Sequence, residues 1–148
     1  MKKLEGKVCV ITGASKGIGE GIAKVYAKYG AKLVLAARGP KVLELASELK
    51  SQGFEATGVQ VDVSDFESCK KLAEITEKTY GKVDTLVCNA GICVLEDFLG
   101  DDDFKNRDMH IDINIKGVWN ATKAILPSIV SKSPLKNLIL FFQKTKIR

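Results

Sequence analysis

The chain has 148 residues, of which 45% are hydrophobic and 28% charged, and this length and composition fit one globular domain with its own core. The net charge of +5 lies in the last 17 residues, which contain basic side chains and no acidic one, so residues 1–131 are neutral overall. A basic tail can attract nucleic acid or an acidic membrane. Residues 1–131 have no interleaved aromatic and basic motif to support either, and we expect neither partner.

The four cysteines and the single histidine argue against a metal site. Cys9, Cys69, Cys88 and Cys93 form no C-x-x-C pair, and His110 has no second ligand beside it. Cys9 and Cys88 lie in apolar runs and are expected to be small core residues, and His110 a surface or hydrogen-bonded core residue. The N-terminus is too polar for a signal peptide and no apolar run reaches membrane-spanning length, so we expect a reducing, cytoplasmic location.

Short apolar runs alternate with longer segments of helical periodicity along the chain. The run Val8–Thr12 is typical of a buried strand, and the apolar spacing after it predicts a helix that ends at Gly30. A capping box predicts that another helix starts at Ser64 and runs to about Tyr80. The expected strands are 8–12, 32–37, 56–63 and 83–88, and the expected helices start at Gly19, Pro40, Ser64 and about Asp103, the last ending near Val130.

This alternation predicts an α/β fold with a Rossmann-type doubly wound parallel sheet, because parallel strands need crossover helices and crossovers are right-handed. The sheet would be incomplete, with about four to five strands, the fifth formed by the apolar run 137–142. We expect one domain at 1–131 and an atypical basic tail at 132–148. Ligands of such sheets bind at the carboxyl ends of the strands, near the point where the strand order reverses.

A glycine cluster, Thr12-Gly13-Ala14-Ser15-Lys16-Gly17-Ile18-Gly19, joins the first strand to the first helix. Gly13 would allow the tight turn, Gly17 the approach of a pyrophosphate to the backbone, and Gly19 the close packing of helix and strand. The free N–H groups of a helix N-terminus suit a phosphate. A plain strand-to-helix turn also needs glycine, but the place of this cluster in the first βαβ unit predicts an NAD(P)-binding domain at 1–131.

The end of the second strand bears on which dinucleotide binds. NAD-binding domains place a carboxylate about 20 residues beyond the glycine loop, where it holds the ribose 2′-hydroxyl. This chain has Ala36-Ala37-Arg38 there, and the guanidinium of Arg38 suits a 2′-phosphate. Lys16 adds a second positive charge, so the sequence favours NADP(H) over NAD(H). The alternative is a solvated pair of surface cations, which is common for these residue types.

Four motifs in the same order resemble the short-chain dehydrogenase/reductase family over about residues 4–131. They are the glycine motif 12–19, Asp62-Val63 after the third strand, Asn89-Ala90-Gly91 after the fourth, and Asn114 in the long helix. The third motif departs from the Asn-Asn-Ala-Gly of the family at its first position, which is Cys88 here. An unrelated Rossmann-type protein such as a methyltransferase would not explain the last two motifs together.

The resemblance implies a role for each motif. Asp62 and Val63 would contact the adenine, the stretch 89–91 the ribose side, and Asn114 would be the helix asparagine of the catalytic tetrad. From the residues alone, Asp62 could instead cap the next helix, Asn89 could satisfy backbone groups at the strand end, and Asn114 could face solvent. The expected cofactor-binding residues are Gly13, Ser15, Lys16, Gly17, Ile18, Gly19, Arg38, Asp62, Val63, Asn89, Ala90 and Gly91.

The resemblance also implies catalytic residues that the chain does not contain. In the family a serine polarises the substrate carbonyl, and a tyrosine in Tyr-x-x-x-Lys acts as acid or base. None of the three tyrosines, Tyr26, Tyr29 and Tyr80, has a lysine at that spacing. By rough register Phe141 or Phe142 occupies the position of the serine. We therefore expect a C-terminally truncated family member that arises from a frameshift, a retained intron or an alternative exon.

Three functions stay open on the sequence. The family reaction is hydride transfer between NADP(H) and a carbonyl or secondary alcohol. With Asn114 as the remaining tetrad member, we expect cofactor binding at most. The second reading is a non-catalytic, regulatory fragment that pairs with itself or with a full-length relative through the helix 103–130, through which family members often associate. The third is a non-functional truncated product. The substrate stays unnamed, because the substrate loop of the family would follow the residues present here.

Overall fold

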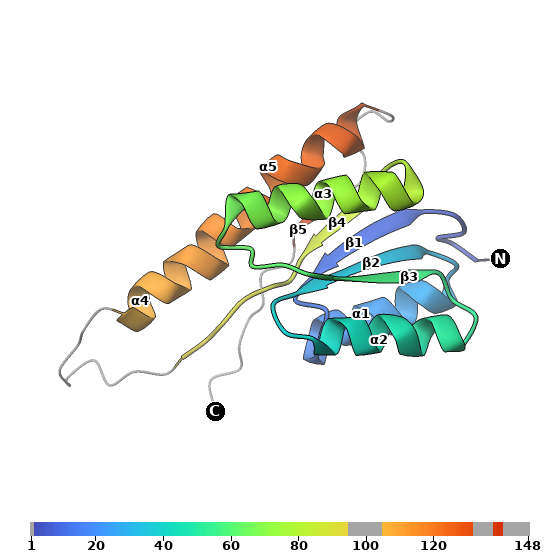
Figure 1. Cartoon of the computed structure of the whole chain (residues 1–148), viewed down its shortest axis with the longest axis horizontal. Helices are drawn as coiled ribbons and strands as arrows, with labels where there is room; N and C mark the ends of the chain where they lie inside the picture. Colours follow the sequence, from blue (N-terminus) through green and yellow to red (C-terminus); the bar gives the residue numbers. More distant parts are fainter. Residues whose placement is uncertain (1, 95–104, 132–137, 141–148) are drawn as a thin grey trace.

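The computed structural model describes residues 2–94, 105–131 and 138–140, and it shows a sheet with helices on both faces (Figure 1). The strands are β1 Val8–Thr12, β2 Lys32–Ala37, β3 Ala56–Gln60, β4 Thr85–Cys88 and β5 Leu138–Leu140. The helices are α1 Gly17–Lys28, α2 Lys41–Ser51, α3 Phe66–Tyr80, α4 Lys105–His110 and α5 Gly117–Val130, with a π-helix, η1 Ile111–Lys116, between the last two.

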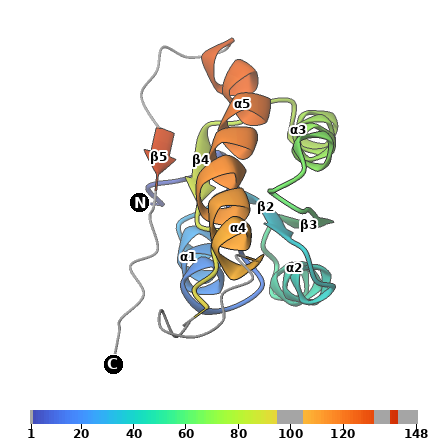
Figure 2. The ribbon, with the colours of Figure 1, turned by 90° about the vertical axis from the view of Figure 1, so that its left-hand side faces the viewer.

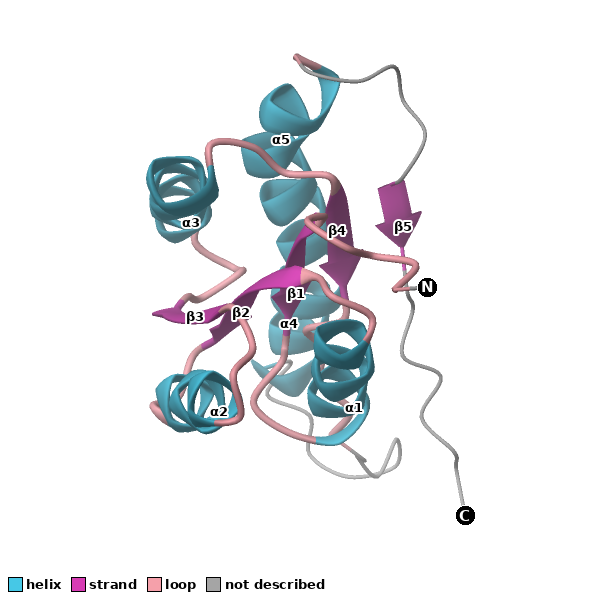
Figure 3. Ribbon diagram, turned by 90° about the vertical axis from the view of Figure 1, so that its right-hand side faces the viewer, coloured by secondary structure: helices cyan, strands magenta, loops and turns pink. Residues whose placement is uncertain are grey.

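The strand order confirms the predicted Rossmann-type fold. The order is β3-β2-β1-β4-β5, and neighbouring strands are parallel throughout (Figure 3). From β1 the chain moves outward to β2 and β3, and it then crosses to β4 on the other side of β1. The order therefore reverses between β1 and β4, and the loops that follow these two strands diverge. A crevice opens at such a point, and this is where doubly wound sheets bind ligands.

Two hydrophobic cores lie on opposite faces of the sheet. Figure 2 shows α1 and α2 on one side and α3 and α5 on the other. Cys9 and Ile11 of β1 pack with α1 and α2, whereas Val10 packs with α3 and α5, because successive side chains of a strand point to opposite faces. All of β1 is buried, as expected for the central strand of a parallel sheet. The carboxyl end of β1 is thereby fixed between two packed layers.

Helix α3 begins one residue later than its capping box predicts. Asp65, not Ser64, is the N-cap, and its carboxylate accepts hydrogen bonds from the backbone N–H groups of Glu67 at 3.1 Å and Ser68 at 3.2 Å. The hydroxyl of Ser64 instead donates to Asp62 Oδ1 at 2.6 Å. The expected start at Ser64 was wrong, because a carboxylate one position later accepts two of the free N–H groups at this helix end.

Several element ends also differ from the sequence expectation. β3 ends at Gln60 rather than 63, because its partner β2 ends at Ala37, which is opposite Gln60. β4 begins at Thr85 rather than 83, opposite Cys9 of β1, and α1 begins at Gly17 rather than 19. Residues 61–63 therefore lie beyond the paired strand and lead into the crevice, and a hydrogen bond from the N–H of Val61 to the Ala37 carbonyl at 2.9 Å still ties their start to β2. The expected start of the long helix at Asp103 lies outside the described residues.

The fifth strand lies within the apolar run 137–142 that predicts it. Leu138–Leu140 pairs in parallel with β4, with Leu86 opposite Leu138 and Cys88 opposite Leu140. The rest of the basic tail, including positions 141 and 142, lies outside the described residues. The sheet of the described chain thus has five strands, the upper end of the expected range.

Candidate functional site

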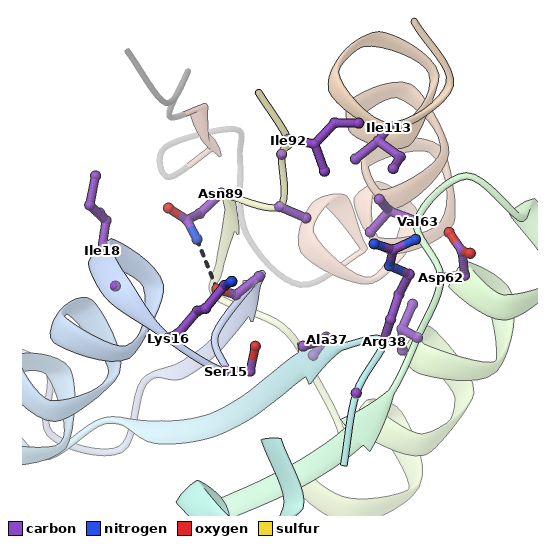
Figure 4. A pocket seen from close by; sticks show the side chains of 17 residues that line it. Ser15, Lys16, Ile18, Ala37, Arg38, Asp62, Val63, Asn89, Ile92 and Ile113 are labelled. Carbon is purple, nitrogen blue, oxygen red and sulfur yellow. Dashed lines mark hydrogen bonds between the residues drawn. The ribbon is translucent and has the colours of Figure 1, made fainter. Parts of the chain in front are cut away.

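A pocket of about 720 Å³ opens at the carboxyl ends of the strands where the order reverses (Figure 4). It combines the loop after β1 with the ends of β2, β3 and β4 and one residue of η1. Ala36, Ala37, Gly39, Val61, Ile92 and Ile113 line it without having been predicted. The predicted residues that line it are Gly13, Ser15, Lys16, Gly17, Ile18, Arg38, Asp62, Val63, Asn89, Ala90 and Gly91.

The glycines of the β1–α1 loop have distinct steric reasons to be glycine. Gly13 has φ 66° and Gly17 has φ 61°, in the left-handed region that favours glycine. A Cβ on Gly13 would lie 2.7 Å from Ala90 Cα, so its absence lets the loop approach the chain after β4. A Cβ on Gly19 would overlap the carbonyl oxygen of Gly13 and lie 2.5 Å from Asn89 Nδ2. Gly19 is not among the residues that line the pocket. Its lack of a side chain lets Gly13 and Asn89 pack against the start of α1.

Gly17 differs from the other two, because open space lies above it. A Cβ built there meets no atom of the described residues within 4 Å. Ser15, Lys16 and Ile18 flank it, and the side chain of Ile18 is 52% exposed. α1 starts at this point, so the first backbone N–H groups of the helix have no intrahelical partner. The loop can thus present N–H donors and a helix N-terminus to an anion in the pocket.

Thr12 and Asn89 join the ends of β1 and β4. The Asn89 side chain donates from Nδ2 to the carbonyls of Thr12 and Gly13, both at 3.1 Å. The Thr12 hydroxyl accepts from the N–H groups of Asn89 at 3.0 Å and Ala90 at 3.1 Å and donates to the Val87 carbonyl at 3.3 Å. Both side chains are buried, with 2% and 6% exposed. Asn89 therefore satisfies backbone groups as well as lining the pocket, and Thr12, the first residue of the glycine motif, holds the wall in place without lining it.

Two cations stand at the edge of the pocket. Lys16 follows β1 and Arg38 follows β2, and both residues are exposed. Figure 4 shows the Arg38 side chain extending toward Asp62 and Val63. Neither cation forms an ion pair with a carboxylate in residues 2–94 or 105–131. Two unpaired positive charges beside a helix N-terminus favour a ligand with more than one phosphate group.

Asp62 lines the pocket but does not cap a helix. Its Oδ1 accepts hydrogen bonds from the N–H of Ser64 at 2.9 Å and from the Ser64 hydroxyl. Its own N–H donates to Ser68 Oγ at 3.0 Å. These bonds fold residues 62–64 into a tight turn after β3 and hold the Asp62 side chain at the pocket wall, beside the buried side chain of Val63.

Asn114 lies behind the pocket wall, in the π-helix η1. Its Oδ1 accepts from the N–H of Ile92 and its Nδ2 donates to the Ile92 carbonyl, both at 2.8 Å. The side chain is therefore not solvent-facing. It fixes the backbone of Ile92, which with Ile113 forms the apolar part of the wall. A single π-helical turn inside a longer helix often marks a functional site.

A second contact of the long helix, made by Asn120, was not predicted from the sequence. Asn120 Nδ2 donates to the carbonyls of Val63 at 3.0 Å and Ser64 at 3.2 Å. Gly117 lies one turn earlier, where a Cβ would be 2.7 Å from Val63 Cγ2. The absence of that side chain lets α5 approach the loop after β3. The only sequence signal was a glycine three residues before an asparagine, which is too weak to predict the contact.

The buried cysteines contribute packing rather than reactivity. Burial raises the pKa of Cys9 and of Cys69 to about 11. Burial also raises the pKa of Cys88, although the Thr122 hydroxyl, 3.8 Å from its sulfur, opposes that shift. These thiols stay protonated near neutral pH and are poor nucleophiles. Cys88, which departs from the family motif, is thus a buried strand residue next to Asn89.

Within residues 2–94, 105–131 and 138–140, no cluster of three or more His, Cys, Asp or Glu side chains is placed to hold a metal ion. Among the helices of that same part of the chain, none combines the length and apolar character needed to cross a bilayer.

Comparison with known proteins places this fold and pocket in a family. The family model for short chain dehydrogenases matches residues 7–135. Oxidoreductase UcpA from Salmonella typhimurium is 50% identical over 132 residues, which are 89% of this chain and 50% of the relative. Its counterpart from Escherichia coli K12 is 48% identical over 134 residues, again 89% of this chain and 50% of the relative. The chain spans about half the length of the curated relatives it matches.

Solved structures agree with the sequence comparison. A short-chain type dehydrogenase/reductase from Mycobacterium marinum superimposes with a TM-score of 0.86 at 30% identity, over 94% of this chain and 56% of that one. An alcohol dehydrogenase from Thermococcus sibiricus, solved in complex with 5-hydroxy-NADP, gives a TM-score of 0.76 at 38% identity, over 83% and 53% of the two chains. Together with the glycine loop, the reversal of strand order and the pocket between them, these matches show that the chain belongs to the short chain dehydrogenase family.

Proposed function

We propose that the pocket binds a nicotinamide dinucleotide and prefers NADP(H) to NAD(H). The observation that carries the proposal is the pair of cations beside the glycine loop, Lys16 and Arg38, which have no carboxylate partner among the described residues. A 2′-phosphate gives Arg38 a bidentate partner that NAD(H) lacks. The relative from Thermococcus sibiricus was solved with an NADP derivative, which supports the same class of ligand here.

The residues of the pocket fit such a cofactor. Ser15 and Lys16 would engage phosphates with Arg38, and Ile18 would lie beneath the pyrophosphate at the open space over Gly17. Asp62 and Val63 would meet the adenine, and residues 89–91 the ribose side. When bound, the cofactor supplies hydride transfer, which in the family joins NADP(H) to a carbonyl or secondary alcohol.

These 148 residues are proposed to bind the cofactor without carrying out that reaction. None of the three tyrosines precedes a lysine at the Tyr-x-x-x-Lys spacing, so the acid–base pair of the family is not present among them. Asn114, the remaining tetrad residue, binds the Ile92 backbone and not the pocket space. Its role in the described chain is to position the wall.

The test is a fluorescence titration of the purified 148-residue chain with NADPH and, separately, with NADH. We expect saturable binding of NADPH and clearly weaker binding of NADH. The same preparation is then mixed with NADPH and a panel of aldehydes and ketones, and we expect no oxidation of NADPH above background. Equal affinity for both dinucleotides would contradict the preference, and lack of binding to either would contradict the function.

A second candidate function is association through the long helix. Ile111, Ile115 and Trp119 lie four residues apart on one face of η1 and α5, and their exposed fractions are 38%, 65% and 69%. Large apolar side chains gathered on one exposed face are typical of interaction sites. We propose that this face pairs with a second copy of the chain or with a full-length relative.

Sedimentation measurements test the association. Trp119→Glu places a charge at the most exposed residue of the apolar face and should shift the chain toward the monomer. Leu43→Glu is the matched control, because Leu43 is 44% exposed on α2, away from this face. A wild-type chain that sediments as a monomer at all concentrations would exclude self-association.

A further inference from the structure

The chain that leaves β4 is held by side chains of the neighbouring helix. Asn114 binds both the N–H and the carbonyl of Ile92 at 2.8 Å. Four residues earlier, His110 Nε2 accepts a hydrogen bond from the N–H of Val94 at 3.0 Å. Figure 1 shows the segment after β4 running beside α4 and η1. Two side chains of one helix thus hold alternate residues of this segment.

The two contacts follow one another along both the helix and the segment. His110, the last residue of α4, accepts from the N–H of Val94, and Asn114, in the next turn of η1, donates to the carbonyl of Ile92. The two side chains therefore take the place of a partner strand for the chain beyond the end of β4.

The imidazole of His110 is itself oriented. Its Nδ1 lies 2.6 Å from the backbone carbonyl oxygen of Asn106, one turn earlier in the chain. A carbonyl can only accept, so Nδ1 carries the proton and Nε2 has a free lone pair, which faces the N–H of Val94. The helix backbone therefore fixes both the tautomer and the direction of the acceptor.

We propose that His110 is a positioning residue of the dinucleotide site, which fixes the part of the pocket wall formed by Gly91 and Ile92. The inference rests on the proposed dinucleotide function and adds a residue that lies outside the pocket. Gly91 and Ile92 follow β4, whereas Arg38 follows β2 on the other side of β1. Loss of the His110 bond should therefore weaken contacts with the nicotinamide half of the cofactor and leave the adenosine half unaffected.

Two ligands separate these halves. NADPH extends over both, whereas 2′,5′-ADP carries the adenine and the 2′-phosphate without the nicotinamide. His110→Phe keeps a ring of similar size and removes the acceptor. We expect it to weaken NADPH binding about three- to tenfold, the range for one lost hydrogen bond, and to leave 2′,5′-ADP binding unchanged. His110→Gln offers an amide oxygen toward Val94 and should restore most of the NADPH affinity.

A second variant tests the same bond from its other end. Val94→Pro removes the N–H donor, leaves His110 in place and should reproduce the effect of His110→Phe, so the proposal stays testable if one variant does not fold.

Asn120→Ala is the reciprocal control. It frees the carbonyls of Val63 and Ser64, on the adenine side of the pocket, and should weaken both ligands.

The outcomes are distinct. Selective loss of NADPH affinity in His110→Phe and Val94→Pro, with rescue by His110→Gln, supports the positioning role. If the wild type binds both ligands and His110→Phe weakens both equally or neither, the inference is overturned while the proposed function stands. If the wild type binds neither ligand, the proposed function is overturned, and this inference with it.

Discussion

The amino and carboxyl ends of the parallel strands, called here the amino edge and the carboxyl edge of the sheet, use their charged residues in opposite ways. At the amino edge, Asp84 accepts from the N–H of Val8 at 2.9 Å and pairs with Lys82 at 3.0 Å and Lys7 at 3.5 Å. At the carboxyl edge, Lys16 and Arg38 stand at the pocket without a carboxylate partner among the described residues. Charge at the first edge supports the fold, and charge at the second is available to a ligand.

The carboxyl edge also divides into a rigid part and an adaptable part. Thr12, Asn89, Gly13 and Gly19 are buried or tightly packed, and they give the pocket its shape. The two cations are exposed and long, and they would decide which phosphate is preferred. Substitutions in the rigid part should therefore affect stability and binding together, whereas substitutions of the cations should affect ligand preference alone.

The largest effect is expected at Gly19. In Gly19→Ala the new Cβ would overlap the carbonyl oxygen of Gly13, so the glycine loop must shift. We expect a loss of about 1–3 kcal/mol of unfolding free energy, the usual cost of overpacking, and loss of measurable dinucleotide binding. Urea unfolding and an NADPH titration measure the two effects.

Gly21→Ala is the matched control on the same helix. A Cβ at Gly21 meets no atom of the described part of the chain within 4 Å, and Gly21 is exposed within α1. Alanine favours the helix, so we expect a gain of about 0.5–1 kcal/mol with unchanged binding. Equal unfolding free energies and equal NADPH affinities in the two variants would show that neither stability nor binding requires the close approach of Gly13 to Gly19.

The next effect concerns Arg38 and leaves the fold unchanged. In Arg38→Ala we expect NADPH affinity to fall about 10- to 100-fold, because hydrogen bonds between charged groups are lost, and NADH affinity to stay within about twofold. Lys41→Ala removes a nearby exposed cation that does not line the pocket and should change neither affinity. Equal losses for NADPH and NADH in Arg38→Ala would contradict a role in selecting the 2′-phosphate.

The smallest effect is expected at the amino edge. Burial alone would raise the pKa of Asp84, but the hydrogen bond from Val8 and the charges of Lys82 and Lys7 outweigh it and lower the pKa overall. Because the pKa of Asp84 in the folded state lies below its unfolded value near 3.8, the ionised carboxylate stabilises the fold at pH values above 3.8. This stabilisation is lost as the pH falls through the folded-state pKa. Asp84→Asn should therefore cost about 1 kcal/mol at pH 7, and the difference from wild type should vanish in strong acid.

Thermal unfolding of both chains at several pH values between 7 and 2 measures this. The comparison isolates Asp84 from the other carboxyl groups, because those titrate in both chains. Dinucleotide binding at pH 7 should be the same in wild type and Asp84→Asn. A difference in stability that persists at pH 2 would show that charge is not the cause.

The parts of this protein that the sequence predicts are those encoded by local patterns. A glycine cluster after an apolar run identifies the loop after β1, and Asn89 directly follows the run that forms β4. Parallel strands bring such loops to one edge, so their place in one pocket follows from the fold class. The family match and the doubly wound sheet confirm the predicted family and fold.

The contacts that the sequence does not predict depend on how the long helix docks. Asn120 binds a carbonyl 57 residues earlier in the chain, and Asn114 one 22 residues earlier. No periodicity encodes which loop a helix face will meet. A local competition explains the error at α3, where Ser64 matched the capping box but its hydroxyl binds Asp62.

The hydrogen bonds between Thr12 and Asn89 have a consequence for folding kinetics. Their partners are 77 residues apart, so the pocket can close only after β4 has docked beside β1. Contacts of such long separation form late, because their loop entropy must be overcome first. All residues of the glycine loop precede residue 20, but the part of the pocket that follows β4 would reach the loop only in one of the last folding steps. The appearance of dinucleotide binding during refolding would therefore report the arrival of β4, and a slow phase seen by bound NADPH but not by helical signal would mark that step.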